Sequence, residues 1–219
     1  MLSGRPVGVR IAFWAESFVG TPYDTDPLGA YVRSEKLVCE NEVDCMYHVF
    51  RSVELATSNT PEQAEERALE LRFTTHGRLE GGRVLNYDER FQYGEDMVYS
   101  GKWGRDVTAE LGATASIPGS RGRDVIIYLP KEELLKAENM AKLMDGDLIF
   151  FVKEPARRAV GEVVGHLGIV KMDGGTPCLI HASGSKSTPE KQGGGKVKKV
   201  GLAAYLQGMR FIGVIVTRF

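Results

Sequence analysis

The stretch Asp44-Cys-Met-Tyr-His-Val-Phe-Arg-Ser-Val-Glu-Leu-Ala56 predicts a buried helix that begins at a cysteine. Asp44 is a good N-cap residue, and apolar residues then recur at helical spacing, namely Met46, Val49, Phe50, Val53 and Ala56. Cys45 would lie in the first turn of a helix over residues 45–57, where unpaired backbone N–H groups and the macrodipole favour a thiolate. Cys45 is therefore a candidate nucleophile. The alternative is that it is a small buried apolar residue.

Two further helices are expected, one before and one after this one in the sequence. Apolar residues at helical spacing between residues 7 and 19, followed by Gly20, predict the first. Ser58-Asn-Thr-Pro61 is typical of an N-cap and first turn, and predicts a helix over residues 61–71. Residues 23–42 are rich in Gly, Pro and Asp and are interpreted as a long excursion.

The second half of the chain changes to strand patterns. Residues that favour strands are dense in five segments, 125–129, 147–153, 166–172, 178–182 and 211–218, and a helix is expected over residues 131–143. Residues 73–122 lack sustained periodicity and are interpreted as an insertion in which residues 91–99 favour a helix. Helices followed by antiparallel strands predict an α+β fold, with residues 1–219 forming one domain.

Composition excludes several classes of function. The chain has 219 residues and a formal net charge of −1, and its basic cluster Lys196, Lys198 and Lys199 is short, so nucleic-acid binding is disfavoured. Its apolar stretches fall short of the roughly 18 residues that a membrane span needs. The first residues do not resemble an export signal. The run Gly193-Gly-Gly195-Lys lacks the spacing of a phosphate loop and is interpreted as a connector.

Two histidines are candidate partners for a cysteine nucleophile, which needs a general base and a group that orients it. His166 opens one apolar run and His181 closes the next, and a hairpin turned at Asp173-Gly-Gly175 would bring them side by side. Two alternatives remain, a pair of satisfied core histidines or a metal pair. A metal would need a third ligand, and only Cys178 lies near, in an uncertain register.

The other histidines and cysteines are less suitable. His48 lies one helical turn from Cys45, but both side chains would share one helix face and leave no room for a substrate. His76 lies in polar sequence and is expected to be solvated. Cys39 and Cys178 lack a helix start and are interpreted as structural. Three cysteines without CxxC spacing predict neither a disulfide framework nor a zinc knuckle.

Five motifs follow one another in a characteristic order, Gly20-Thr-Pro-Tyr23, Asp44-Cys45, Asp145-Gly-Asp-Leu-Ile149, Gly165-His-Leu-Gly-Ile169 and Ile180-His-Ala-Ser183. Together they resemble the NlpC-type cysteine peptidases of bacterial cell-wall turnover, which have a papain-like α+β core. Four more stretches resemble the N-acetylmuramoyl-L-alanine amidase-like branch, Arg90-Phe-Gln-Tyr93, Asp106–Gly112, Tyr128–Lys131 and Val197–Arg218. The resemblance covers nearly the whole chain.

This resemblance implies a Cys-His-His site without cofactor or metal. Cys45 would be the nucleophile, His166 the base and His181 the orienting residue. The substrate-binding residues would be Tyr23, Asp44, Arg90 and Tyr93. We interpret Asp147 as structural, setting the turn into the central strand.

The implied substrate is peptidoglycan or a muropeptide, cut at the amide between the muramic lactyl group and L-Ala. The alternatives are a γ-D-glutamyl-diamino acid endopeptidase, a papain-like acyltransferase and a non-catalytic binding module. Met46-Tyr47 replaces the Ser-Gly of many endopeptidases, and Gln92 replaces the usual histidine of the amidase-like branch. The sequence therefore leaves open which bond is cut and whether the substrate is the polymer or a soluble fragment. It also leaves open the oligomeric state and the compartment, for which the resemblance favours the cell envelope. Aromatic residues of the insertion, Tyr87, Tyr93, Tyr99 and Trp103, are expected to stack on a sugar.

Overall fold

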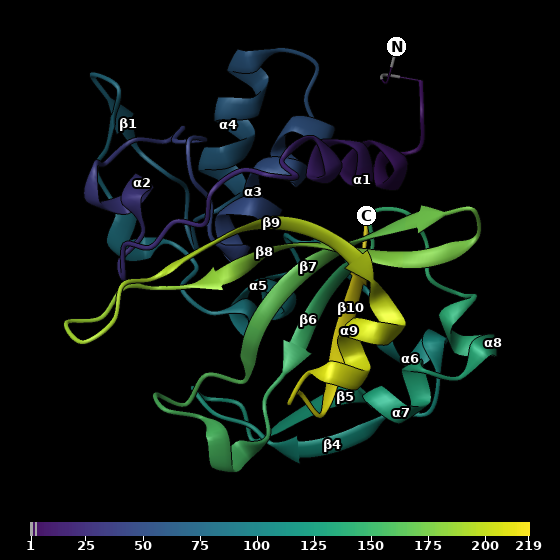
Figure 1. Cartoon of the computed structure of the whole chain (residues 1–219). Coiled ribbons are helices and arrows are strands. Elements are labelled where there is room, and N and C mark those ends of the chain that lie inside the picture. The colour runs from purple at the N-terminus through teal and green to yellow at the C-terminus, as the bar shows by residue number, and fades with distance from the viewer. Residues whose placement is uncertain (1, 3) are drawn as a thin grey trace. The chain divides into compact units, whose positions relative to one another are not determined.

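The computed structural model describes residue 2 and residues 4–219 as a mixture of helices and antiparallel strands (Figure 1). The helices are α1 (Val7–Ser17), α2 (Ala30–Arg33), α3 (Cys45–Ala56), α4 (Pro61–Leu71), α5 (Gly94–Ser100), α6 (Thr108–Leu111), α7 (Lys131–Leu134), α8 (Ala137–Met140) and α9 (Leu202–Gly208). The strands are β1 (Leu79–Glu80), β2 (Arg83–Val84), β3 (Arg105–Asp106), β4 (Ala115–Pro118), β5 (Val125–Pro130), β6 (Leu148–Val152), β7 (Val164–Asp173), β8 (Thr176–Ser185), β9 (Gly194–Gly201) and β10 (Gly213–Arg218). The predicted α+β class is confirmed.

The chain forms two compact units. Unit 1 comprises Met1–Phe91 and Ile180–Lys199, and unit 2 comprises Gln92–Leu179 and Val200–Phe219. The chain passes between them after Phe91 and again within β8 and β9. The expectation of one domain with an insertion over residues 73–122 stays a prediction.

Unit 1 is built around α3, which begins at Cys45 as predicted. The Oδ1 atom of Asp44 accepts a hydrogen bond from the Tyr47 backbone N–H at 2.8 Å, so Asp44 is the N-cap. Helix α4 also matches its prediction, because Thr60 caps it at the backbone N–H of Gln63 and Pro61 occupies its first turn. Helix α3 is buried well beyond the predicted apolar stripe, since nine of its residues are buried, including His48, Arg51 and Glu54.

Unit 2 is built on an antiparallel sheet in the strand order β4-β5-β10-β6-β7, with β3 also paired to β10. Strand β6 is central and entirely buried. Its side chains join those of β5, β7, β10 and α9 in one apolar core, which includes Leu129, Phe151, Val170, Leu202 and Val214. Ile149 and Phe151 of β6 belong to this core, and the side chains of Leu148, Phe150 and Val152 on its other face are buried as well.

Asp147, at the start of this central strand, has the structural role that the sequence indicated. Its Oδ2 atom accepts a hydrogen bond from the Met144 backbone N–H at 2.9 Å and so closes the turn before β6. Both carboxylate oxygens also accept from the Arg218 guanidinium at 2.7 Å, and the Asp147 side chain is fully buried. The turn and the last strand of unit 2 are thus held by the same carboxylate.

The predicted hairpin turn after β7 is confirmed, since β7 ends at Asp173 and β8 begins at Thr176. Gly174 and Gly175 have φ angles of 56° and 85°. Positive φ at both central residues is the requirement of a tight hairpin turn, and glycine meets it without steric cost.

Two sequence-based assignments are wrong. The single helix expected over residues 131–143 is interrupted at Lys136, which is extended (ψ 134°) and precedes α8. The Asn139 side-chain amide donates to the Glu133 carbonyl at 2.8 Å, so a side chain supplies a hydrogen bond that the broken helix lacks. The glycine run at 193–195 is more than a connector, because β9 begins at Gly194. At Gly195 (φ 139°) a Cβ atom would collide with the Ser183 carbonyl.

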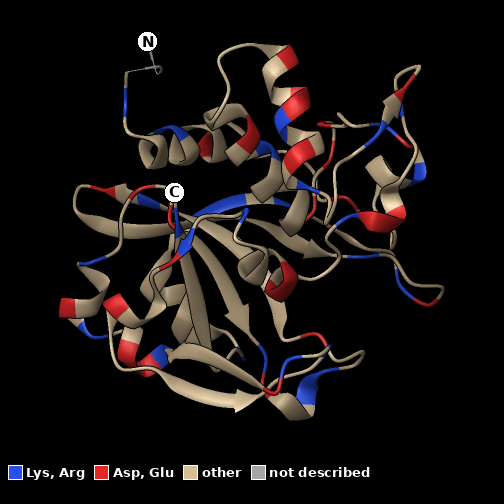
Figure 2. Ribbon diagram, turned by 180° about the vertical axis from the view of Figure 1, so that it is seen from behind, with Lys and Arg blue, Asp and Glu red and all other residues tan. Residues whose placement is uncertain are grey.

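Charged residues are concentrated in the helices and loops, and among the strands of the sheet the buried β6 is uncharged whereas the more exposed β9 carries lysines (Figure 2). This distribution agrees with the burial of the sheet strands, because unpaired charges are rarely buried. Within residue 2 and residues 4–219, no helix is long and apolar enough to cross a membrane.

Candidate active site

Cys45 is the first residue of α3 and is half-buried. Its neighbour Asp44 uses one carboxylate oxygen for the N-cap hydrogen bond, and its Oδ2 atom accepts from Lys186 Nζ at 3.0 Å. The position of Cys45 at a capped helix N-terminus is the one that lowers the pKa of a thiol in general.

Tyr23 is held beside the segment that leads into α3. It forms a parallel bridge with Val43. The Val43 backbone N–H donates to the Pro22 carbonyl at 3.0 Å, and the Asp24 N–H donates to the Val43 carbonyl at 3.1 Å. Burial raises the pKa of the Tyr23 phenol, and the negative charges of Cys45, Asp44 and Asp24 raise it further. Tyr23 therefore keeps its proton near neutral pH and remains an O–H donor.

Lys186 is a member of this group that the sequence did not reveal. Its ammonium lies 3.0 Å from Asp44 Oδ2 and 3.7 Å from Asp24 Oδ2, and 5.6 Å from the centre of the Tyr23 ring. A single lysine in the polar segment after β8 gives no sequence signal. Its role depends on a contact across 142 residues of chain.

His181 lies on β8 in unit 1 and is only 4% exposed. Burial lowers its pKa to about 4, with smaller contributions from His48 and Lys198. The imidazole is therefore neutral near pH 7. A neutral ring suits a group that orients another residue by a hydrogen bond better than one that carries a fixed positive charge.

His48 has a structural role, in agreement with its rejection as a base. Its Nε2 atom lies 3.2 Å from the Ala15 carbonyl oxygen of α1, and its side chain is completely buried. Burial lowers the pKa of His48 to about 4. His48 thus ties α3 to α1 as a neutral ring, while His76 is exposed, as expected.

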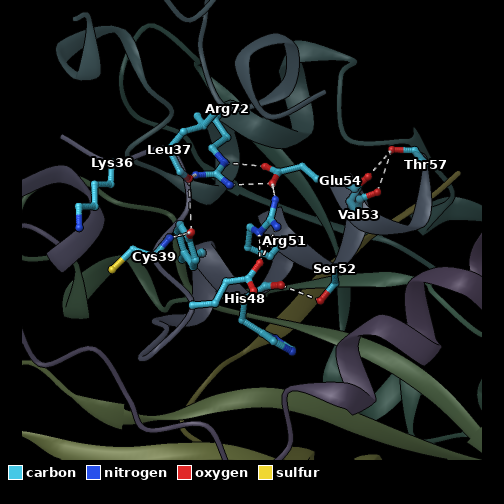
Figure 3. Close-up of polar contacts among 12 residues, drawn as sticks. Lys36, Leu37, Cys39, His48, Arg51, Ser52, Val53, Glu54, Thr57 and Arg72 are labelled. Atoms are coloured by element: carbon cyan, nitrogen blue, oxygen red, sulfur yellow. Dashed lines mark hydrogen bonds and ion pairs between the residues drawn. The ribbon is translucent and has the colours of Figure 1, made fainter. Parts of the chain in front are cut away.

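A buried ionic network fixes the other end of α3 (Figure 3). The Glu54 carboxylate is fully buried and accepts from Arg72 Nε at 2.5 Å and Nη2 at 2.7 Å. Arg51 donates to the same carboxylate at 2.9 Å and to Glu40 at 2.6 Å. Arg72 also donates to the Leu37 carbonyl at 2.7 Å. Helix α3 is therefore locked to the end of α4 and to the loop at residues 37–40.

His166 lies in unit 2, on β7, and is half-buried. The register of β6 and β7 shifts between Phe151 and Val152, so that Gly165 is the extra residue of a β-bulge immediately before His166. The His166 ring stacks on Phe151, with centroids 5.9 Å apart, and lies 6.2 Å from Tyr205. Bulges commonly redirect a side chain next to a functional site, and this one sets the direction of His166.

The remaining candidate residues are engaged in local contacts. Arg90 in unit 1 donates from Nη1 to the Tyr87 carbonyl at 2.9 Å and so supports the turn at residues 87–89. Tyr93 in unit 2 has the Arg121 guanidinium 3.7 Å above its ring. The Asp44 side chain caps α3. Substrate contacts for these residues remain expectations.

The expectation that insertion aromatics stack on a sugar needs correction. Trp103 is fully buried and Tyr87 is 7% exposed, so neither ring can receive a sugar. Tyr99 is 46% exposed, but the Arg123 guanidinium covers one face at 4.7 Å. Packing occupies the rings of Trp103 and Tyr87, and a cation–π contact occupies one face of Tyr99.

The cysteines differ in their surroundings. Burial raises the pKa of the Cys39 thiol, and the carboxylates of Glu42 and Asp24 raise it further. None of the three cysteines forms a disulfide in the described structure. Nor does any group of three or more His, Cys, Asp and Glu residues gather as a metal site in residue 2 and residues 4–219.

Comparisons with known proteins reveal likeness at the level of the fold. Neither a family model nor a curated protein matches the sequence. An N-acetylmuramoyl-L-alanine amidase structure from Bacteroides uniformis matches with a TM-score of 0.68 and 21% identity over 97% of this chain and 98% of the other. A putative xylanase from Bacteroides fragilis matches with a TM-score of 0.68 and 20% identity over 95% of this chain and all of the other. A Legionella pneumophila protein, described by the family model DUF1460, matches with a TM-score of 0.68 and 16% identity over 98% of this chain and 89% of the other. The chain therefore shares its α+β fold with an N-acetylmuramoyl-L-alanine amidase.

Removal of the buried carboxylate tests the role of the ionic network. Glu54→Gln leaves the Arg72 and Arg51 guanidinium groups without their shared counter-charge. We expect the free energy of unfolding to fall by about 3 kcal/mol or more, because breaking a buried pair leaves an uncompensated charge. Urea denaturation measures this loss. The exposed Glu65→Gln on α4 is the matched control and should change stability by less than about 0.5 kcal/mol.

Acid should destabilise the protein through its buried histidines. The folded state holds His48 and His181 with pKa values of about 4, whereas an unfolded histidine titrates near 6.5. Between these values the unfolded state binds more protons, so the free energy of unfolding should fall as the pH drops from about 6.5 to 4. For His48 the loss is roughly 3 kcal/mol.

Urea denaturation at several pH values measures this decline. His48→Gln keeps a donor for the Ala15 carbonyl but removes the titration, so its stability should fall less steeply than that of the wild type in this window. Asp26 and Glu162, whose pKa values are lowered to about 2, change the free energy of unfolding mainly below pH 4.5. Equal slopes for both proteins between pH 6.5 and 4.5 would contradict the assignment.

Proposed function

We propose that this protein is a papain-like cysteine amidase of the NlpC type that hydrolyses an amide bond in peptidoglycan fragments. The observation that carries the proposal is the position of Cys45 at the capped N-terminus of α3, with the protonated phenol of Tyr23 nearby. The fold shared with an N-acetylmuramoyl-L-alanine amidase supports this substrate class. The proposed roles are nucleophile for Cys45, base for His166 and orienting residue for His181.

The proposed reaction begins when His166 takes the thiol proton and Cys45 Sγ attacks the carbonyl carbon. The π electrons of the carbonyl move to its oxygen, and the backbone N–H of Cys45 and the Tyr23 O–H are suitable donors to that oxyanion. Collapse breaks the C–N bond, and His166 gives its proton to the leaving amine. A thioester remains on Cys45.

Water completes the cycle. His166 accepts a proton from water, whose oxygen attacks the thioester carbon. The C–S bond then breaks and His166 returns the proton to the departing sulfur, which releases a carboxylic acid and the thiol. His181 is neutral at pH 7, which suits its proposed role. When His166 has taken the thiol proton, the positive charge then resides on His166 alone.

We favour the lactyl amide of N-acetylmuramic acid as the bond cut, because the amidase-like motifs and the name of the Bacteroides uniformis neighbour point the same way. A γ-D-glutamyl-diamino acid endopeptidase and a papain-like acyltransferase are the alternatives. A cell-envelope location follows from the same substrate class.

Alkylation identifies the most reactive thiol. Cys45 should react fastest with dilute iodoacetamide below pH 7, because the thiolate fraction determines the rate. Cys39 should react slowly, since burial and nearby carboxylates raise its pKa. Peptide mass spectrometry after short exposures measures the order of labelling. Earlier labelling of Cys39 or Cys178 than of Cys45 would contradict the assignment.

Product analysis tests the reaction itself. Incubation with purified muropeptides should release peptides with a free L-Ala amine and leave N-acetylmuramic acid intact, as mass spectrometry of the products would show. Cys45→Ala should abolish turnover. His166→Ala should lose far more activity than His181→Asn, because Asn still forms a hydrogen bond with an imidazole while the base has no substitute. Release of L-Ala-D-Glu instead would establish the endopeptidase alternative.

A further inference from the structure

Unit 2 contains a cavity of about 570 Å³ beside the bulge that directs His166. It is lined by Lys153, Arg157, Gly208, Met209, Arg210 and Phe211. A Cβ atom at Gly165 would lie 2.6 Å from Lys153 Cε and 2.8 Å from Phe211 Cε1, so a larger residue there would displace these side chains from the bulge. The wall of the cavity therefore begins one residue before His166.

The charges of this cavity are all positive. Its described lining contains three cations and no carboxylate. Lys153 is paired with Glu162, and Arg157 Nε lies 3.9 Å from Glu154. Arg210 has no ion-pair partner among the residues that the structure describes. Arg210 is thus available to a ligand, and Arg157 can exchange its long, exposed pair with Glu154 for a contact with one.

A second cavity of about 550 Å³ shares Arg157, Arg210 and Phe211 with the first. Lys131, Glu132 and Glu154 line only this second cavity, so carboxylates offset part of its positive charge, whereas the lining of the first contains none. The apolar surface of the first cavity comes from Met209 and Phe211. Phe211 packs on Phe151, with centroids 5.4 Å apart, and Phe151 carries the His166 ring.

We propose that this first cavity is a subsite for a carboxylate carried on the peptide part of the substrate, bound by Arg157 and Arg210. Planar guanidinium groups match carboxylate oxygens in pairs, and the apolar wall accepts the carbon chain beside the carboxylate. The subsite deepens the proposed amidase function and rests on it for the identity of the substrate. Binding energy here would hold the substrate close to His166 during the reaction.

Binding is tested first, with the Cys45→Ala protein so that no turnover intervenes. The probes are N-acetylmuramoyl-L-Ala-D-Glu with free carboxylates and the same compound with both carboxylates converted to amides. Arg157→Gln/Arg210→Gln should raise the Kd of the acid about tenfold and leave the Kd of the diamide unchanged. Arg67→Gln, on the exposed face of α4, is the matched control and should bind both probes like the parent. Arg157→Lys/Arg210→Lys should recover part of the affinity for the acid. That recovery would show that the Gln variant loses binding through its lost charge and not through misfolding.

The outcomes separate this subsite from the proposed reaction. Equal Kd values for acid and diamide in the parent, or no loss in the Gln variant, would overturn the subsite. The Arg157→Gln/Arg210→Gln substitutions can also be made in the protein that keeps Cys45. An unchanged KM for hydrolysis in that variant would overturn the subsite but not the amidase function. Loss of acid binding in the Gln variant, together with no hydrolysis by the wild type, would keep the subsite and overturn the amidase function.

Discussion

The buried carboxylate of Glu54 is the constraint on which unit 1 depends. Two guanidinium groups, from Arg51 and Arg72, bind it in the interior, and a carboxylate without them would cost several kcal/mol to bury. Arg72 follows the last turn of α4, and its third contact reaches the loop at Leu37. One anion therefore fixes the direction of α3 and of two neighbouring segments. Such a network specifies geometry more than it adds stability.

The opposite end of α3 benefits from this rigidity. Cys45 is useful as a nucleophile only if the helix axis and its N-terminal N–H groups stay fixed relative to the groups around it. His48 adds a tie to α1, and Asp44 joins the helix cap to Lys186. Most of the charged and polar side chains of α3 thus serve its position. This explains why the helix is buried almost all round although its sequence predicts a single apolar stripe.

The candidate base is positioned by different physics. In unit 2 the β-bulge at Gly165 and the stacked ring of Phe151 direct His166. The side chains of Lys153 and Phe211 lie against the bulge, in the space that a Cβ atom at Gly165 would occupy. Backbone irregularity, ring packing and a cationic cavity therefore meet next to one histidine. In the proposed function, they would link recognition of the substrate to placement of the base.

Sequence alone determined the features that depend on near neighbours. The start of α3, the bounds of α4 and the turn at Gly174 and Gly175 follow from caps, proline and glycine within four residues, so the pattern of the chain contains them. The break at Lys136, the strand at Gly194 and the partners of Glu54 required the tertiary structure. Arg72 lies 18 residues from Glu54, and Lys186 lies 142 residues from Asp44. Local hydrogen bonds can be inferred from spacing, but burial, pKa values and long-range ion pairs exist only once distant segments have packed together.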